Sequence, residues 1–100
     1  MSKRLPPMHP GEVLREEFLI PLAMSAGALA KACGVPRTRM ERIAGEETGI
    51  TADTALRLSK AFGTSAEFWL NLQNAFDVQT AKGRIADELA RIVRVTERAA

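Results

Sequence analysis

The sequence predicts an all-α protein built as one domain, and three observations lead to this prediction. Apolar residues recur at spacings of three and four along most of the chain, and no stretch alternates as a strand does. Residues that typically begin and end helices flank these stretches, as Ser25 and Gly34 do. The chain has 100 residues, which suffice for one hydrophobic core but not for two.

The first helix is expected to begin at His9-Pro10, after a flexible N-terminal segment, residues 1–8. Proline fits the first helical position because its missing N–H would have had no partner there. His9 is the only histidine and is interpreted as a cap or surface residue, not as a catalytic base. The inward side of this helix is predicted to consist of Val13, Leu14, Phe18 and either Ile20 or Leu22.

Two short helices joined by a tight turn are predicted next. The first begins at Ser25, whose hydroxyl caps it, and ends at Gly34, because glycine adopts the left-handed backbone that closes a helix. The second, called the recognition helix below, is predicted over Pro36–Ala44. Apolar residues give the pair its inward side: Leu29, Ala30, Cys33, Val35, Met40 and Ile43. Cys33 is interpreted as a small core residue rather than a reactive thiol.

The outward side of the recognition helix is basic and rich in hydrogen-bond donors, with Arg37, Thr38, Arg39 and Arg42. The whole chain has a net charge of only +2, but residues 25–44 carry +3 and residues 45–80 carry −3. A helix-turn-helix with this face is the shape that enters a DNA major groove. An ordinary helical corner whose charges face solvent is the alternative.

The DNA-binding hypothesis assigns base contacts and phosphate contacts to different residues. Arg37, Thr38 and Arg39 are expected to reach base edges, because they lie at the start of the recognition helix. Phosphate contacts, which fix register without reading sequence, are expected from Ser25, Lys31, Arg42 and the backbone of the loop at 45–49.

Two further helices complete the predicted domain. Thr51 is expected to cap one that stops at Gly63, and Thr64 to cap the next in a capping box with Glu67. The last of these helices is rich in large apolar side chains. Phe68 and Leu72 are expected in the core, whereas Trp69 and Phe76 fit either the core or a patch that faces a partner.

From Thr80 onward the chain predicts one amphipathic C-terminal helix, residues 81–100, beyond a domain at 9–80. Its apolar side carries Ile85, Leu89, Ile92, Val93 and Thr96. This stripe must pack on its own domain or on another chain. The predicted dimer or partner interface therefore comprises Trp69, Phe76, Ile85, Leu89 and Ile92.

Several classes of function are disfavoured. The sequence offers no nucleophile beside a base and no glycine-rich phosphate loop, so we do not expect an enzyme. One histidine and one cysteine cannot form a zinc site, and neither a metal nor a cofactor is expected. No apolar run approaches the roughly 20 residues needed to span a bilayer, and no secretory signal is visible, so a cytoplasmic location is expected.

Three stretches together resemble the HigA family of bacterial antitoxins, within the phage-repressor-like helix-turn-helix proteins. They are HPGEVLREEFL, ITADTALRLSKAFGTS and EFWLNLQNAFD, and the resemblance covers roughly residues 9–80. It implies a five-helix DNA-binding core and a homodimer formed through the C-terminal region. The resemblance also implies binding to a palindromic operator, repression of the protein's own operon, and inhibition of a HigB-type toxin, an mRNA-cleaving nuclease of the RelE class.

The sequence departs from the family pattern at the start of each helix of the pair. Pro36 stands where the recognition helix often has a Ser or Thr cap, and Gly27 and Ala28 offer only backbone groups where polar side chains are common. Two alternatives to the antitoxin hypothesis therefore remain open. One is a regulator that acts without a toxin, and the other is a protein-interaction module that does not bind DNA.

Overall fold

The computed structural model describes residues 7–98, and within this range every regular element is helical. The predicted all-α class is therefore confirmed. A short first helix is continued by a π-helical segment, η1, and six further helices follow. In order, the elements are α1 (Pro10–Val13), η1 (Leu14–Leu19), α2 (Ala26–Cys33), α3 (Arg37–Ala44), α4 (Ala52–Phe62), α5 (Ala66–Arg84), α6 (Ala86–Ala90) and α7 (Val95–Arg98).

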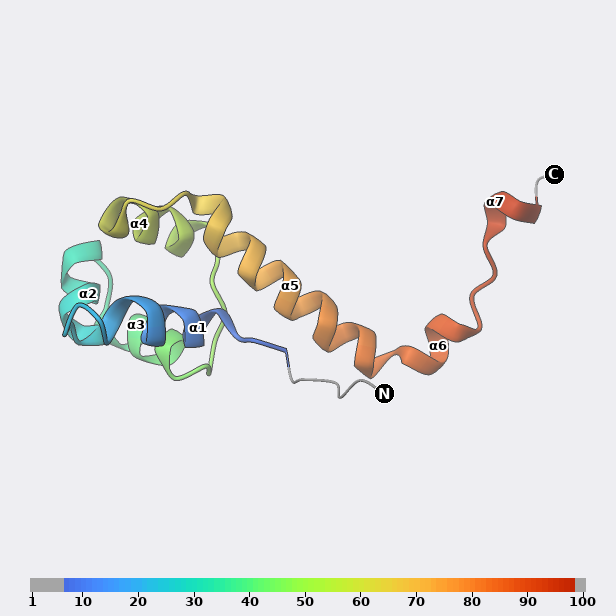
Figure 1. The fold of residues 1–100 in the computed structure, drawn as a ribbon, viewed down its shortest axis with the longest axis horizontal. Coiled ribbons are helices and arrows are strands. Elements are labelled where there is room, and N and C mark those ends of the chain that lie inside the picture. The colour runs from blue at the N-terminus through green and yellow to red at the C-terminus, as the bar shows by residue number, and fades with distance from the viewer. Residues whose placement is uncertain (1–6, 99–100) are drawn as a thin grey trace.

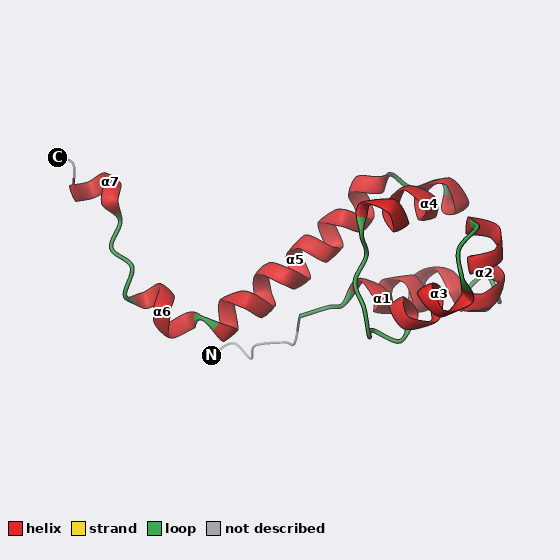
Figure 2. Cartoon of the chain, turned by 180° about the vertical axis from the view of Figure 1, so that it is seen from behind, coloured by secondary structure: helices red, strands yellow, loops and turns green. Residues whose placement is uncertain are grey.

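The helices form a body and an arm. Elements α1 to α4 gather at one end of the molecule with the beginning of α5, and the rest of α5 leads away from them toward α6 and α7 (Figure 1). The view from behind shows the same separation (Figure 2). The radius of gyration is 17.4 Å and the principal extents are 56 × 31 × 21 Å. A compact chain of this length has a radius of about 13 Å, so the arm stands clear of the core.

The core lies where the helices of the body meet. Trp69 at the start of α5 is fully buried, with the rings of Phe18 and Phe62 at 5.0 and 6.3 Å between centroids. The elements η1, α2, α3 and α4 each contribute at least one apolar side chain with no more than 1% exposure: Leu14, Leu29, Met40, Ile43 and Leu58. Burial of this apolar surface is the main force that holds the helices together.

The first helix turns more widely than predicted. The Ile20 N–H donates to the Arg15 carbonyl at 3.0 Å, an i→i+5 bond typical of a π-helix. The extra residue per turn shifts the inward side by one position. Leu19 is buried with 5% exposure, whereas Ile20 and Leu22 are 61% and 56% exposed. The prediction that either of these two faces inward is therefore wrong.

The predicted caps are mostly confirmed. The Ser25 hydroxyl accepts from Ala28 N, and the Thr51 hydroxyl accepts from Thr54 N. Gly34 and Gly63 close α2 and α4 with φ of 72° and 74°. His9 caps α1 through its Nδ1, which accepts from Gly11 N at 2.9 Å, and is itself buried.

One cap prediction is wrong. Ser65, not Thr64, is the N-cap of α5 and accepts from Phe68 N at 3.0 Å. The Thr64 hydroxyl instead accepts from the indole N–H of Trp69 at 2.8 Å. A buried indole N–H needs such an acceptor, so the Thr64 hydroxyl bonds Trp69 while the neighbouring Ser65 hydroxyl caps the helix.

The chain beyond Thr80 also differs from the single helix that was predicted. Helix α5 runs through Thr80 to Arg84, the backbone bends at Ile85, and residues 91–94 lie outside any helix between α6 and α7. None of residues 81–96 is buried, so core packing does not hold this part of the chain as one straight helix. Of the predicted flexible segment at 1–8, residues 1–6 lie outside the described residues.

Candidate nucleic-acid interface

Helices α2 and α3 form the predicted helix-turn-helix. The turn is closed by Gly34 and by the Val35 N–H, which donates to the Ala30 carbonyl at 3.0 Å. Helix α3 begins at Arg37, one residue later than predicted, with Pro36 as an N-cap that makes no side-chain bond. It is anchored through Met40 and Ile43, so its opposite side faces outward.

The far end of α3 is held by the first helix. Arg15 Nη1 donates to the carbonyl oxygen of Ala44, the last residue of α3, at 2.6 Å. Its Nη2 lies 3.1 Å from the carboxylate of Glu46, a residue with φ of 63°. The carboxylates of Glu46 and Glu16 raise the pKa of Arg15, Glu16 most strongly through its hydrogen bond. Arg15 therefore satisfies a carbonyl that the helix leaves unpaired and fixes the direction of α3.

Five of the six predicted DNA-binding residues are exposed to solvent: Ser25, Lys31, Arg37, Thr38 and Arg42. The start of α2 and the start of α3 are close together, because a Cβ at Gly27 would lie 3.0 Å from Cδ of Arg37. The absence of a side chain at Gly27 thus leaves room for Arg37. Arg39 differs from the other five, since it is only half exposed and turns toward α4.

Each of the three arginines on α3 has an acidic neighbour. Arg37 Nε lies 3.3 Å from Glu41, Arg42 Nε lies 3.9 Å from Glu47, and Arg39 Nη1 lies 2.5 Å from Asp53. Two of these carboxylates, Glu47 and Asp53, come from beyond residue 44. The net charge of the surface is therefore less positive than the +3 counted for residues 25–44 alone. The side chains of Arg37 and Arg42 are 73% and 67% exposed, so water and salt screen these two pairs strongly.

Asp53 is the functional-site candidate that the sequence analysis missed. Its Oδ2 accepts from Arg39 on α3 and also from Nε of Arg57 on α4, at 2.5 and 3.0 Å. The hydrogen bond from Arg39, followed by that from Arg57, holds the pKa of the Asp53 carboxyl below its usual value. The i,i+4 spacing of Asp53 and Arg57 is visible in the sequence. The contact with Arg39 joins residues 14 apart and is not.

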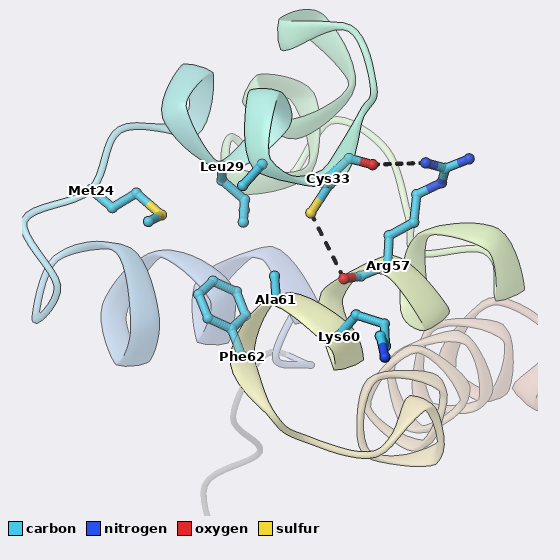
Figure 3. A pocket seen from close by; sticks show the side chains of 8 residues that line it. Met24, Leu29, Cys33, Arg57, Lys60, Ala61 and Phe62 are labelled. Atoms are coloured by element: carbon cyan, nitrogen blue, oxygen red, sulfur yellow. Dashed lines mark hydrogen bonds between the residues drawn. The ribbon is translucent and has the colours of Figure 1, made fainter.

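Arg57 connects this cluster to the end of α2. Its Nη1 donates to the Cys33 carbonyl at 2.7 Å, and the Cys33 thiol lies 3.8 Å from the Arg57 carbonyl, as Figure 3 shows. Both residues line a cavity of about 360 Å³ between α2 and α4, with Leu29 and Phe62 among its apolar walls. Cys33 is buried, which confirms its interpretation as a core residue, and burial raises the pKa of its thiol.

The predicted partner interface is divided by the structure. Trp69 is fully buried, so its assignment to an interface is wrong, and the core alternative is the one realised. Phe76 is half-buried, with its ring edge-on to His9 at 4.8 Å. On the arm, Ile85 is half-buried, whereas Leu89 and Ile92 are 41% and 70% exposed. The expected core residue Phe68 is itself 37% exposed.

The described part of the chain contains no group of three His, Cys, Asp or Glu side chains arranged to hold a metal ion. None of the helices described over 7–98 combines the length and the apolar character required to cross a membrane.

No protein-family model matches the chain. Among curated proteins it is 54% identical over 81 residues to virulence-associated protein I of Dichelobacter nodosus, covering 81% of this chain and 75% of that protein. It is 38% identical over 82 residues to antitoxin HigA-1 of Vibrio cholerae, covering 82% of this chain and 77% of the antitoxin.

A solved structure of Pseudomonas aeruginosa antitoxin HigA with the higBA promoter superimposes with a TM-score of 0.84 at 41% identity. That match covers 88% of this chain and 96% of the other. The identity and the shared coverage extend well beyond the helix-turn-helix that many regulators have in common. The chain belongs to the HigA family of helix-turn-helix antitoxins.

Proposed function

We propose that this protein is a sequence-specific DNA-binding repressor that regulates its own operon. The observation that carries the proposal is the exposed outer side of α3, together with the likeness to an antitoxin whose structure contains its promoter. Helix α3 is anchored at both its apolar side and its last carbonyl, so its outer side is a rigid surface. A rigid recognition element loses little conformational freedom on binding.

In this proposal the residues of the two helices have separate roles. Arg37 and Thr38 lie at the end of α3 that enters the major groove, where an arginine can pair with guanine. Lys31 on α2 and Arg42 on α3, both exposed, bind phosphates and fix the register, as does the exposed Ser25 at the start of α2. No catalytic step is assigned to any residue, and the site of action is the DNA in the bacterial cytoplasm.

The test is binding of the full chain to duplex DNA from its own upstream region, compared with a scrambled duplex. Arg37→Ala is expected to weaken binding to the upstream duplex by about 1–3 kcal/mol and the scrambled duplex less. Lys60→Ala is the matched control, because it removes an exposed cation from the last turn of α4, outside the helix pair and the arm. Equal affinity of the wild-type chain for both duplexes would contradict the proposal.

A homodimer formed through the arm is part of the same proposal. An open groove of about 1010 Å³ lies at the bend between α5 and α6, and Phe76, Gly83 and Leu89 are among its lining residues. Together with Ile85 and Ile92, these residues give the arm an apolar surface that the body of the molecule does not cover. A symmetric dimer would place two copies of α3 about 34–36 Å apart on a palindromic operator. Leu89→Asp is expected to yield a monomer in sedimentation and to weaken operator binding.

We also propose a HigB-type toxin as the protein partner, since antitoxin HigA-1 is a relative. The experiment is co-expression with any small basic open reading frame that adjoins this gene, read out as rescue of growth and co-purification. A regulator without a toxin is the competing possibility. It predicts that no such neighbour exists, or that the neighbour's product neither arrests growth nor co-purifies with this chain.

A further inference from the structure

The carboxylate of Asp53 has a structural position that gives it a role in DNA recognition, if the proposed DNA-binding function holds. One oxygen, Oδ2, accepts hydrogen bonds from two guanidinium groups on different helices. Arg57 is the fixed partner, because its Nη1 is also bonded to the Cys33 carbonyl at the end of α2. Arg39 is the exchangeable partner: among residues 7–98, Asp53 is the one acidic side chain with which it forms an ion pair.

Asp53 itself is well held. It is the second residue of α4, one turn before Arg57 and two residues after the Thr51 cap, so the helix N-terminus favours its negative charge. The Asp53 carboxylate is therefore fixed on α4 and is connected to α2 through Arg57. Its contact with α3 is the ion pair with Arg39. The Arg39 side chain remains 38% exposed, which leaves part of its guanidinium accessible.

This arrangement treats the two kinds of DNA acceptor differently. A phosphate carries a negative charge, so it competes with Asp53 for the guanidinium and is repelled by the carboxylate. The O6 and N7 acceptors of guanine are neutral, and a guanidinium has five N–H donors, of which Asp53 uses one on Nη1. Arg39 can therefore bind a base edge without leaving Asp53.

We propose that Asp53 is a specificity-determining positioning residue, which keeps Arg39 away from backbone phosphates and presents it to base edges. In the absence of the carboxylate, Arg39 would be free to bind phosphate in any duplex. Binding to non-cognate DNA would then strengthen, and discrimination would fall.

The experiment compares Asp53→Asn with the wild type on the upstream duplex and on a scrambled duplex, by fluorescence anisotropy over a series of salt concentrations. We expect scrambled-DNA affinity to rise about two- to fivefold, as release of an exposed ion pair allows. The slope of log K against log salt for that duplex should steepen by about 0.9, the value for one added phosphate contact. Affinity for the upstream duplex should change less.

Matched variants separate this effect from a general change of charge. Glu67→Gln removes a carboxylate from the second position of the next helix, α5, and should leave both affinities as they are. Asp53→Glu keeps the charge and should restore the wild-type specificity ratio. In an Arg39→Ala background, Asp53→Asn should no longer strengthen binding to scrambled DNA.

Thermal melting of each variant shows whether it folds. If Asp53→Asn does not fold, Arg39→Ala provides the test: it should weaken binding to the upstream duplex and leave the scrambled-DNA salt slope unaltered. A decrease of that slope would mean that Arg39 already contacts phosphate, and the proposal would be wrong.

The proposal would also be overturned if Asp53→Asn and Glu67→Gln had the same effect, or if Asp53→Asn acted equally with and without Arg39. A wild-type chain that does not distinguish the two duplexes would contradict the proposed function itself. A chain that distinguishes them but is indifferent to Asp53 would remove this inference alone.

Discussion

Gly11 on α1 lies directly against the backbone carbonyl of Ile43 on α3. A Cβ at Gly11 would be 1.8 Å from that oxygen, well inside any possible contact. The first helix and the recognition helix are therefore in backbone contact at this point. With the bond from Arg15 to Ala44, this contact makes the start of the chain a support for α3.

Gly11→Ala is accordingly expected to destabilise the protein by more than about 3 kcal/mol, because backbone on both sides must move to admit a methyl group. Glu17→Ala is the control, since Glu17 is an exposed residue of the same first helix. That change should alter the free energy of unfolding by no more than about 0.5 kcal/mol. Urea unfolding of both variants measures the difference, and equal effects would contradict the packing described.

Trp69 and Thr64 make a second testable pair, because the indole N–H has the Thr64 hydroxyl as its acceptor. Thr64→Val should cost about 1–3 kcal/mol by leaving that N–H unpaired. In a Trp69→Phe background the same change should cost little, since the N–H is gone. A double-mutant cycle by chemical denaturation measures the coupling. Purely additive effects would show that the bond contributes nothing to the stability of the body.

The stability conferred by Asp53 should depend on pH in a defined direction. In the folded state, hydrogen bonds from Arg39 and then Arg57 hold the pKa of the Asp53 carboxyl below its ordinary value of 3.8. Because the folded pKa is depressed, this stabilisation is present above the unfolded pKa and is lost as pH falls through the folded pKa. The melting temperatures of the wild type and Asp53→Asn should therefore differ near neutral pH and converge in acid.

Melting curves recorded between about pH 2 and pH 7 test this expectation. Repeating them in an Arg39→Ala background provides the control, since the largest cause of the shift is then removed. The two curves should then differ less at every pH. A difference that grew toward acid pH would have the wrong sign.

Lys31 is predicted to bind a phosphate, because it is exposed on α2 beside the recognition helix. Lys31→Ala should weaken binding to upstream and scrambled duplexes alike and reduce the salt slope by about 0.9. Titrations at several salt concentrations, with Lys60→Ala as the reference for loss of an exposed cation, provide the measurement. An unaltered slope would remove Lys31 from the set of phosphate-binding residues.

Many features of this fold could be predicted from the sequence because they depend on local interactions. The caps at Ser25 and Thr51 and the glycines at 34 and 63 act within one turn of the chain, and all four limit helices where predicted. The helix-turn-helix, its apolar anchors and its outward basic residues followed from the same short spacings. Such features are properties of neighbouring residues, so the order of the residues determined them.

Contacts between distant segments decided the rest. Trp69 is buried where Phe18 of the first helix packs against it, and Arg39 turns sideways because α4 brings Asp53 to it. The fold of the arm likewise depended on the absence of a core beside it, which the amphipathic pattern beyond Thr80 could not reveal. Burial and ion pairing depend on which segments meet in space, and only the tertiary structure determined that.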